Sequence, residues 1–103
     1  MKKTFPLHLP DQTDSRVITA IQVTLNKYVK RERRKALPTE AAGWDFRCRV
    51  GANPETALPC QLAEIPSDIE AVALAGHPGV YVEILAEPRP KIVVTEGAEK
   101  GGV

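Results

Sequence analysis

Cysteine and histidine are scarce in this sequence, which limits the metal and redox chemistry that it can support. There are two cysteines, Cys48 and Cys60, and two histidines, His8 and His77, in 103 residues. The cysteines lack the C-x-x-C spacing of a redox pair or a zinc knuckle, and no histidine lies at ligand spacing from a cysteine or from Asp45. We therefore expect no metal site and no cofactor, and we interpret both cysteines as small buried hydrophobic residues.

Motifs that carry enzymatic chemistry are equally scarce. Ser15 and Ser67 are the only serines, and both are better explained as residues at the start of a helix. No glycine-rich loop of the kind that holds phosphate is present. Asp45 lies between two aromatic residues, but a single carboxylate does not make an acid–base mechanism. We therefore predict no catalytic residue and expect a non-enzymatic protein.

Long apolar runs are also missing. No uncharged stretch approaches the ~18 residues that are needed to span a bilayer. The basic start of the chain resembles the first part of a secretory signal, but Pro6, His8, Pro10 and Asp11 interrupt the apolar region that such a signal needs. We expect a cytoplasmic protein with no membrane partner, whose cysteines stay reduced.

The composition that remains is that of one globular domain. Hydrophobic residues make up 43% of the chain and charged residues 26%, which is ordinary for a folded protein. The length leaves room for a single domain. We assign residues 1–90 to this domain, and residues 91–103, which are rich in Gly and Glu, to a loose C-terminal tail.

The near-zero net charge of +1 hides a polarity along the chain. Residues 1–52 hold 11 basic and 5 acidic residues, a net charge of +6, whereas residues 53–103 hold 3 basic and 8 acidic residues, a net charge of −5. A distribution of this kind affects association rather than fold. One hypothesis is therefore self-association, in which the basic half of one copy docks on the acidic half of another.

Hydrophobic periodicity predicts alternating strands and helices. Apolar residues alternate in three segments and recur at helical spacing in a long one, and a second helix is short and rich in Ala. We expect strands at 3–9, 44–50 and 79–86, a weak strand at 57–62, and helices at about 14–37 and from Ser67, or from near Leu62, to about Ala75. Asp11 or Thr13 caps the first helix. The expected core consists of Val17, Ile18, Ile21, Leu25, Tyr28, Val29, Trp44, Phe46, Cys48, Val50, Val80, Val82 and Ile84.

Elements in this order predict an α+β protein. The expected architecture is a two-layer sandwich with two helices on one face of a three- or four-stranded sheet. If the weak strand near Leu58 forms, the order βαββαβ matches the ferredoxin-like arrangement. Pro6 fits an edge or irregular strand, and Pro59 indicates an irregular one, because proline cannot donate to a β ladder.

Three segments resemble a known family. They are Met1-Lys-Lys-Thr-Phe-Pro-Leu7, the run from Lys27 to Pro38, and Trp44-Asp-Phe46 together with Val80-Tyr-Val-Glu-Ile-Leu-Ala86. The chain from residue 1 to about residue 88 is similar to a family of small bacterial proteins of unknown function; Pro66 and the stretch from Pro88 to Pro90 depart from its pattern. The resemblance implies a bacterial cytosolic protein, and it implies no activity, ligand or catalytic residue.

The basic run in the long helix is the main candidate site. Six cations fall within nine residues, from Lys27 to Lys35. On a helical wheel one group of cations lies nearly opposite the apolar stripe, with no acid on that face. This group comprises Arg16, Lys27, Lys30, Arg31 and Arg34. Glu32 projects instead into the apolar stripe, where we expect it to pair with a cation from the sheet or a loop.

Two interpretations of this face stay open, alongside a merely solvated one. The first is an interaction or scaffold protein whose charged surface docks a protein partner or a second copy of the chain. The alternative is weak binding of nucleic acid without sequence specificity, because a row of cations matches a phosphate backbone. Cations near a helix C-terminus also stabilise the helix itself.

Overall fold

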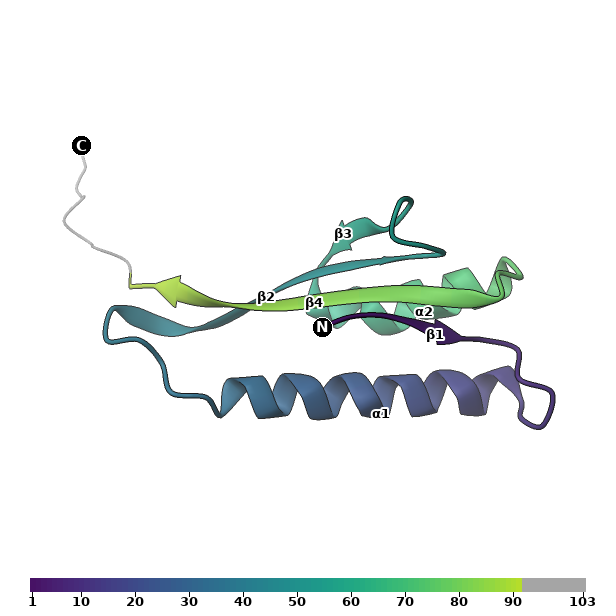
Figure 1. The fold of residues 1–103 in the computed structure, drawn as a ribbon, viewed down its shortest axis with the longest axis horizontal. Coiled ribbons are helices and arrows are strands. Elements are labelled where there is room, and N and C mark those ends of the chain that lie inside the picture. The colour runs from purple at the N-terminus through teal and green to yellow at the C-terminus, as the bar shows by residue number, and fades with distance from the viewer. Residues whose placement is uncertain (92–103) are drawn as a thin grey trace.

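The computed structural model describes residues 1–91, and Figure 1 shows their order along the chain. The elements are β1 (Lys2–Pro6), α1 (Asp14–Arg33), β2 (Ala41–Gly51), β3 (Leu58–Cys60), the short 3-10 helix η1 (Leu62–Glu64), α2 (Ile65–Leu74) and β4 (Gly79–Pro90). The expected tail, apart from Lys91, lies outside the described residues.

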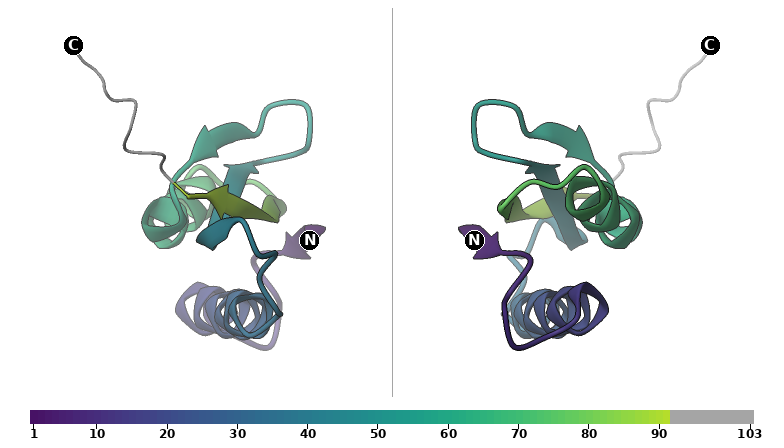
Figure 2. Two further views of the ribbon diagram at one scale, coloured as in Figure 1. Left: turned by 90° about the vertical axis from the view of Figure 1, so that its left-hand side faces the viewer. Right: turned by 90° about the vertical axis from the view of Figure 1, so that its right-hand side faces the viewer.

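The four strands form one antiparallel sheet in the order β1-β4-β2-β3. β4 separates β1 from β2, and β2 separates β3 from β4, so each helix crosses over one intervening strand. The element order βαββαβ alone suggests the ferredoxin-like arrangement. Both helices cover the same face of the sheet, as Figure 2 shows end-on. The predicted α+β architecture, with two helices on one face of the sheet, is confirmed.

The long helix α1 forms where its apolar spacing predicts. Thr13 caps it by accepting a hydrogen bond from the Arg16 backbone N–H at 3.2 Å. Its apolar stripe packs on the sheet and is buried at Val17, Ile21, Leu25 and Val29.

This helix ends at Arg33, four residues before the predicted end at Leu37. The backbone N–H groups of Arg34 and Lys35 donate to carbonyls three residues earlier, which tightens and closes the last turn. The indole Nε1–H of Trp44 donates a hydrogen bond to the Lys35 carbonyl at 3.2 Å. A tertiary contact therefore holds the end of the helix in place, well before Pro38.

The core lies between the helices and the inner face of β4 and β2. Val80, Val82 and Ile84 of β4 are completely buried, as is Ile69 of α2. Register explains this, because the inner residues of β2 and β4 oppose one another across the sheet, as in the pair Val50–Val82. Cys48, predicted to be buried, is 4% exposed.

Four aromatic or aliphatic residues predicted to be core are only half-buried. They are Trp44, Phe46, Ile18 and Tyr28. Figure 1 shows β2 and β4 extending past the C-terminal end of α1 as a two-stranded ribbon. Trp44 and Phe46 belong to the first part of β2, which pairs with the last part of β4. Ile18 and Tyr28 lie on the flanks of the apolar stripe of α1.

The second helix begins earlier than its Ser67 start signal suggests. Helical structure runs from Leu62 through η1 into α2, with Pro66 in the first turn of α2. The capping box is formed by Gln61 and Glu64, whose carboxylate accepts from the Gln61 backbone N–H at 2.7 Å. The alternative start near Leu62 is confirmed. After the helix, Gly76 has a left-handed conformation, with φ 84°.

Candidate interaction surface

The five predicted site residues are all exposed on α1 or directly after it. Lys27, Lys30, Arg31 and Arg34 lie within about two turns of one another, and we call them the basic cluster. Arg16 lies on the same side of the helix but about 16 Å from Lys27 along the helix axis. The structure therefore brings together four of the five predicted residues, at the C-terminal end of α1.

The basic cluster is largely free of internal partners. Among residues 1–91, Lys27, Lys30 and Arg34 form no ion pair. Arg31 makes only a long contact of 3.9 Å to Glu32 and places its guanidinium over the Tyr28 ring. The positive charge of the cluster is therefore available to an external anion.

Glu32 lies on the inner side of α1 and is 8% exposed. Its partner is Lys35, whose Nζ lies 2.8 Å from Glu32 Oε2. The expected pairing is confirmed, and the cation comes from the loop that follows the helix. This pair removes Lys35 from the charge that the helix end presents.

The arginines of the sheet are paired across the strands. On the outer face of the sheet Arg49 meets Glu83 at 3.3 Å, and Arg47 meets Glu87 at 3.4 Å. A third pair joins Arg89 to Asp45 at 3.3 Å. These pairs join the basic half of the sequence to the acidic half, so the polarity along the chain is partly neutralised inside one molecule.

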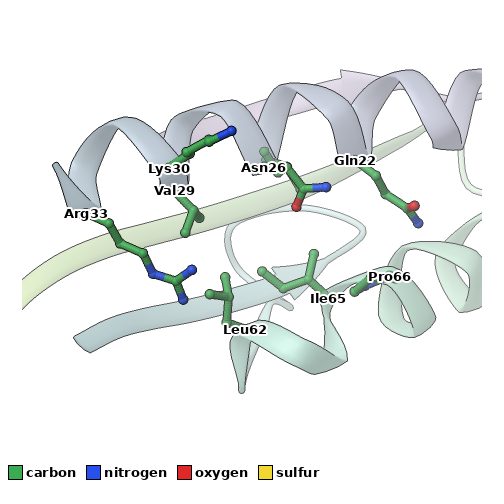
Figure 3. Close-up of a pocket in the computed structure, with 9 residues that line it drawn as sticks. Gln22, Asn26, Val29, Lys30, Arg33, Leu62, Ile65 and Pro66 are labelled. Atoms are coloured by element: carbon green, nitrogen blue, oxygen red, sulfur yellow. The ribbon is translucent and has the colours of Figure 1, made fainter. Parts of the chain in front are cut away.

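An apolar groove runs beside the basic cluster, between α1 and the η1–α2 segment (Figure 3). Its volume is about 410 Å³. Leu25 and Val29 of α1 line it together with Leu62, Ile65 and Pro66 from the opposite wall. Its charged lining residues are Lys30 and Arg33, so the charge at its mouth is wholly positive.

Arg33 was not among the predicted site residues. Figure 3 shows its guanidinium extending from α1 toward Leu62, with Gln22 and Asn26 on the same side of the helix. It also stacks over the Phe46 ring, 5.3 Å from the centroid. The signal in the sequence was the spacing of Gln22, Asn26 and Arg33, which defines a second polar side of α1. Only the position of α2 shows that this side faces a groove.

A second cavity, of about 540 Å³, opens at the edge of the sheet where β3 ends. Phe46, Arg47 and Gln61 line it, and Leu62 lines both this cavity and the groove beside α1. The two hollows therefore adjoin each other around Leu62.

The two thiols face each other across the β2–β3 pair, yet both are free. Burial raises the pKa of Cys48. Burial, followed by the hydrogen bond and the negative charge of Asp68, raises the pKa of Cys60 to about 12. Both thiols are therefore protonated and weakly nucleophilic at neutral pH.

Metal ligands and membrane spans are absent from the part of the chain that the structure describes. No group of three or more His, Cys, Asp or Glu side chains in residues 1–91 is arranged to hold a metal ion. Within the same residues, neither helix has the length and apolar character needed to cross a bilayer.

Residues 1–95 match the model of a family described as Family of unknown function (DUF6172). The chain belongs to this family. The match covers every element of the sheet and both helices, and it confirms the family resemblance of the three sequence segments. No curated protein and no solved structure matches the chain.

Proposed function

We propose that this member of the family is a non-enzymatic interaction protein that docks an acidic protein partner on its basic cluster. The observation that carries the proposal is that Lys27, Lys30 and Arg34 are exposed within about two turns of one another and form no ion pair within residues 1–91. An exposed, unpaired group of like charges adds little to fold stability and attracts a partner of opposite charge.

The groove beside the cluster supports a protein as the partner. Lys30 belongs both to the cluster and to the lining of the groove, whose floor is formed by Leu25, Val29 and Ile65. A charged rim next to an apolar hollow is the usual composition of a protein–protein contact. A partner that carries carboxylates beside an apolar side chain therefore satisfies both features at once.

A cytoplasmic, bacterial setting is part of this proposal. The likeness of the three sequence segments to small bacterial proteins supports the origin.

Nucleic acid is the alternative partner, because the same unpaired cations suit phosphates. The cluster spans about 10 Å of helix and therefore faces only a few phosphates. Tyr28, the aromatic residue nearest to it, is half-buried beneath Arg31 and does not offer a face for a base. These features favour the protein partner.

Carbodiimide crosslinking in lysate of the native cells tests the proposal, because this reagent joins lysine amines directly to carboxylates. We expect links from Lys27 and Lys30 to carboxylates of one acidic protein, and we expect them to weaken as salt rises, since the contact is electrostatic. The triple variant Lys27→Glu, Lys30→Glu and Arg34→Glu should lose that protein. It should keep its fold, because exposed substitutions usually change stability by less than about 0.5 kcal/mol.

The matched control is the triple variant Lys2→Glu, Arg16→Glu and Lys91→Glu. It makes the same change in net charge at exposed positions outside the basic cluster, and it should retain the partner. Equal loss in both triple variants would mean that net charge alone attracts the partner, and would contradict the proposed site. Binding of a duplex oligonucleotide, lost only in the first variant and with a log–log salt slope of up to about −3.6 for four phosphates, would favour the alternative.

A further inference from the structure

The register of the sheet determines to which side each backbone N–H and C=O group points. Met1 and Ile84 exchange both hydrogen bonds, with Ile84 N–H donating to the Met1 carbonyl at 2.8 Å and the Met1 amine donating to the Ile84 carbonyl at 2.7 Å. Backbone groups alternate along a strand. The even-numbered residues of β4 therefore direct N–H and C=O toward β1, and the odd-numbered ones direct them toward β2.

Prolines occupy outward-facing positions on three stretches of strand that lack a neighbour on one side. β4 continues past the end of β1, and there Pro88 and Pro90 stand at even positions, where a free N–H would otherwise face solvent. By the same alternation Pro6 faces outward from β1 and Pro59 faces outward from β3. A proline at such a position costs no hydrogen bond of the sheet and prevents another strand from pairing there.

The open side of β2 has no such protection. β3 pairs only with Cys48, Arg49 and Val50, so residues 41–47 of β2 have a partner on the β4 side alone. Trp44 and Phe46 direct their backbone groups to the open side. Within residues 1–91 their N–H groups form no hydrogen bond there, and the Phe46 carbonyl receives only the Cys48 thiol at 3.7 Å. No proline lies between Ala41 and Arg47.

Cations lie on both faces of this open edge. The side chain of Arg47 meets Glu87 at 3.4 Å and is still 74% exposed on the outer face, and Arg33 lies over Phe46 on the inner face. The cavity at the end of β3 provides space beside the same residues, with Leu62 on its inner side. Glu83, the acid that lines this cavity, is already held by Tyr81 and Arg49.

We propose that the edge of β2 from Ala41 to Arg47 is a docking edge for an extended acidic segment of a partner protein. The segment adds a strand in line with β3 and pairs with the free backbone groups of Trp44 and Phe46. Its side chains alternate, so apolar ones cover Phe46 and Leu62 while carboxylates reach Arg47. Strand addition of this kind derives affinity from backbone hydrogen bonds and specificity from the alternate side chains. The inference rests on the proposed function only in taking the partner to be acidic.

Hydrogen exchange of the full chain tests the proposal. The probe is a blocked peptide of about six residues that alternates Glu and Val, the length of an average strand. In the free protein the amides of Trp44 and Phe46 should exchange rapidly, whereas those of Asp45 and Arg47, bonded to β4, should be protected. Near-millimolar peptide should protect Trp44 and Phe46 selectively, and a peptide that alternates Lys and Val should not. Failure of the acidic peptide to protect these amides overturns the proposal.

A pair of variants at one position separates backbone pairing from side-chain contact. Phe46→Pro removes an outward N–H without removing a bond to β4, and it should weaken the acidic peptide about tenfold relative to Phe46→Ala, which keeps the N–H. Equal affinities contradict strand addition. Protection of Trp44 and Phe46 that rises with protein concentration alone would identify a second copy as the occupant and overturn the acidic partner.

The two proposals fail separately. If the triple reversal of Lys27, Lys30 and Arg34 has no effect on binding of the native partner while the peptide still protects the β2 edge, the proposed site on the basic cluster is contradicted and the proposed docking edge is supported. If the crosslinks form as expected but the peptide leaves the β2 edge unprotected, the proposed docking edge is contradicted and the proposed function is supported.

Discussion

Glu83 is the carboxylate whose protonation is most tightly linked to the fold. The Tyr81 hydroxyl donates to its Oε1 at 2.8 Å, and Arg49 Nη1 lies 3.3 Å from the same oxygen. The Tyr81 hydrogen bond lowers the pKa of Glu83 most; burial partly opposes this, and the charges of Arg49 and Lys2 lower the pKa further. The ionised form is therefore favoured in the folded state.

This lowered pKa predicts a specific acid sensitivity. Its contribution to the free energy of unfolding is present above the ordinary glutamate pKa of about 4.3 and is lost as the pH falls through the lower folded value. Glu83→Gln should therefore flatten the decline of stability below about pH 4.3, as measured by urea unfolding at a series of pH values. An unchanged decline in Glu83→Gln would contradict the assignment.

At the scale of elements, the segment between β2 and β3 depends on one glycine. A Cβ on Gly51 would lie 2.5 Å from the Ala57 Cα, because the returning chain packs directly on β2 there. Arg49 also holds this segment, by donating to the carbonyls of Pro54 and Ala57 at 3.1 and 3.0 Å. Ala57 and the neighbouring Tyr81 are buried on the outer face of the sheet, although no helix covers that face.

Gly51→Ala should therefore destabilise the protein by about 1–3 kcal/mol, the usual range for overpacking. Gly43→Ala is a matched control, since a Cβ there would also meet an atom at 2.5 Å, but that atom is the flexible Nη2 end of Arg89. Urea unfolding should show a clearly smaller loss for Gly43→Ala. Equal losses would show that the approach of Ala57 does not determine the result.

At the scale of the molecule, the charge polarity of the sequence is not a polarity in space. β2 belongs to the basic half and β4 to the acidic half, yet these strands are neighbours and pair Arg47 with Glu87 and Arg49 with Glu83. This favours a separate partner over docking of one half on the other. Sedimentation velocity at about 50 and 200 mM salt should show a monomer at both. A mass that doubles at the lower salt would support self-association instead.

The sequence by itself determined the local elements and the basic cluster. Helical spacing from Val17 to Val29 and alternation from Phe46 to Val50 are properties of short windows, and they agree with the observed α1 and β2. The common side of Lys27, Lys30 and Arg34 follows from the helical repeat alone. The local signals were weaker at element ends, as the early end of α1 at Arg33 shows; the next residues after it contact Trp44, which is distant in sequence.

Only the tertiary structure decided which surfaces are free. The order β1-β4-β2-β3 joins residues that are far apart in sequence, and no short window contains that pairing. It places Pro59 and Pro88 at edges, leaves the edge of β2 open at Trp44 and Phe46, and places Leu62 opposite Arg33. The physical reason is that exposure of a side chain or backbone group depends on what packs against it, and those neighbours come from distant parts of the chain.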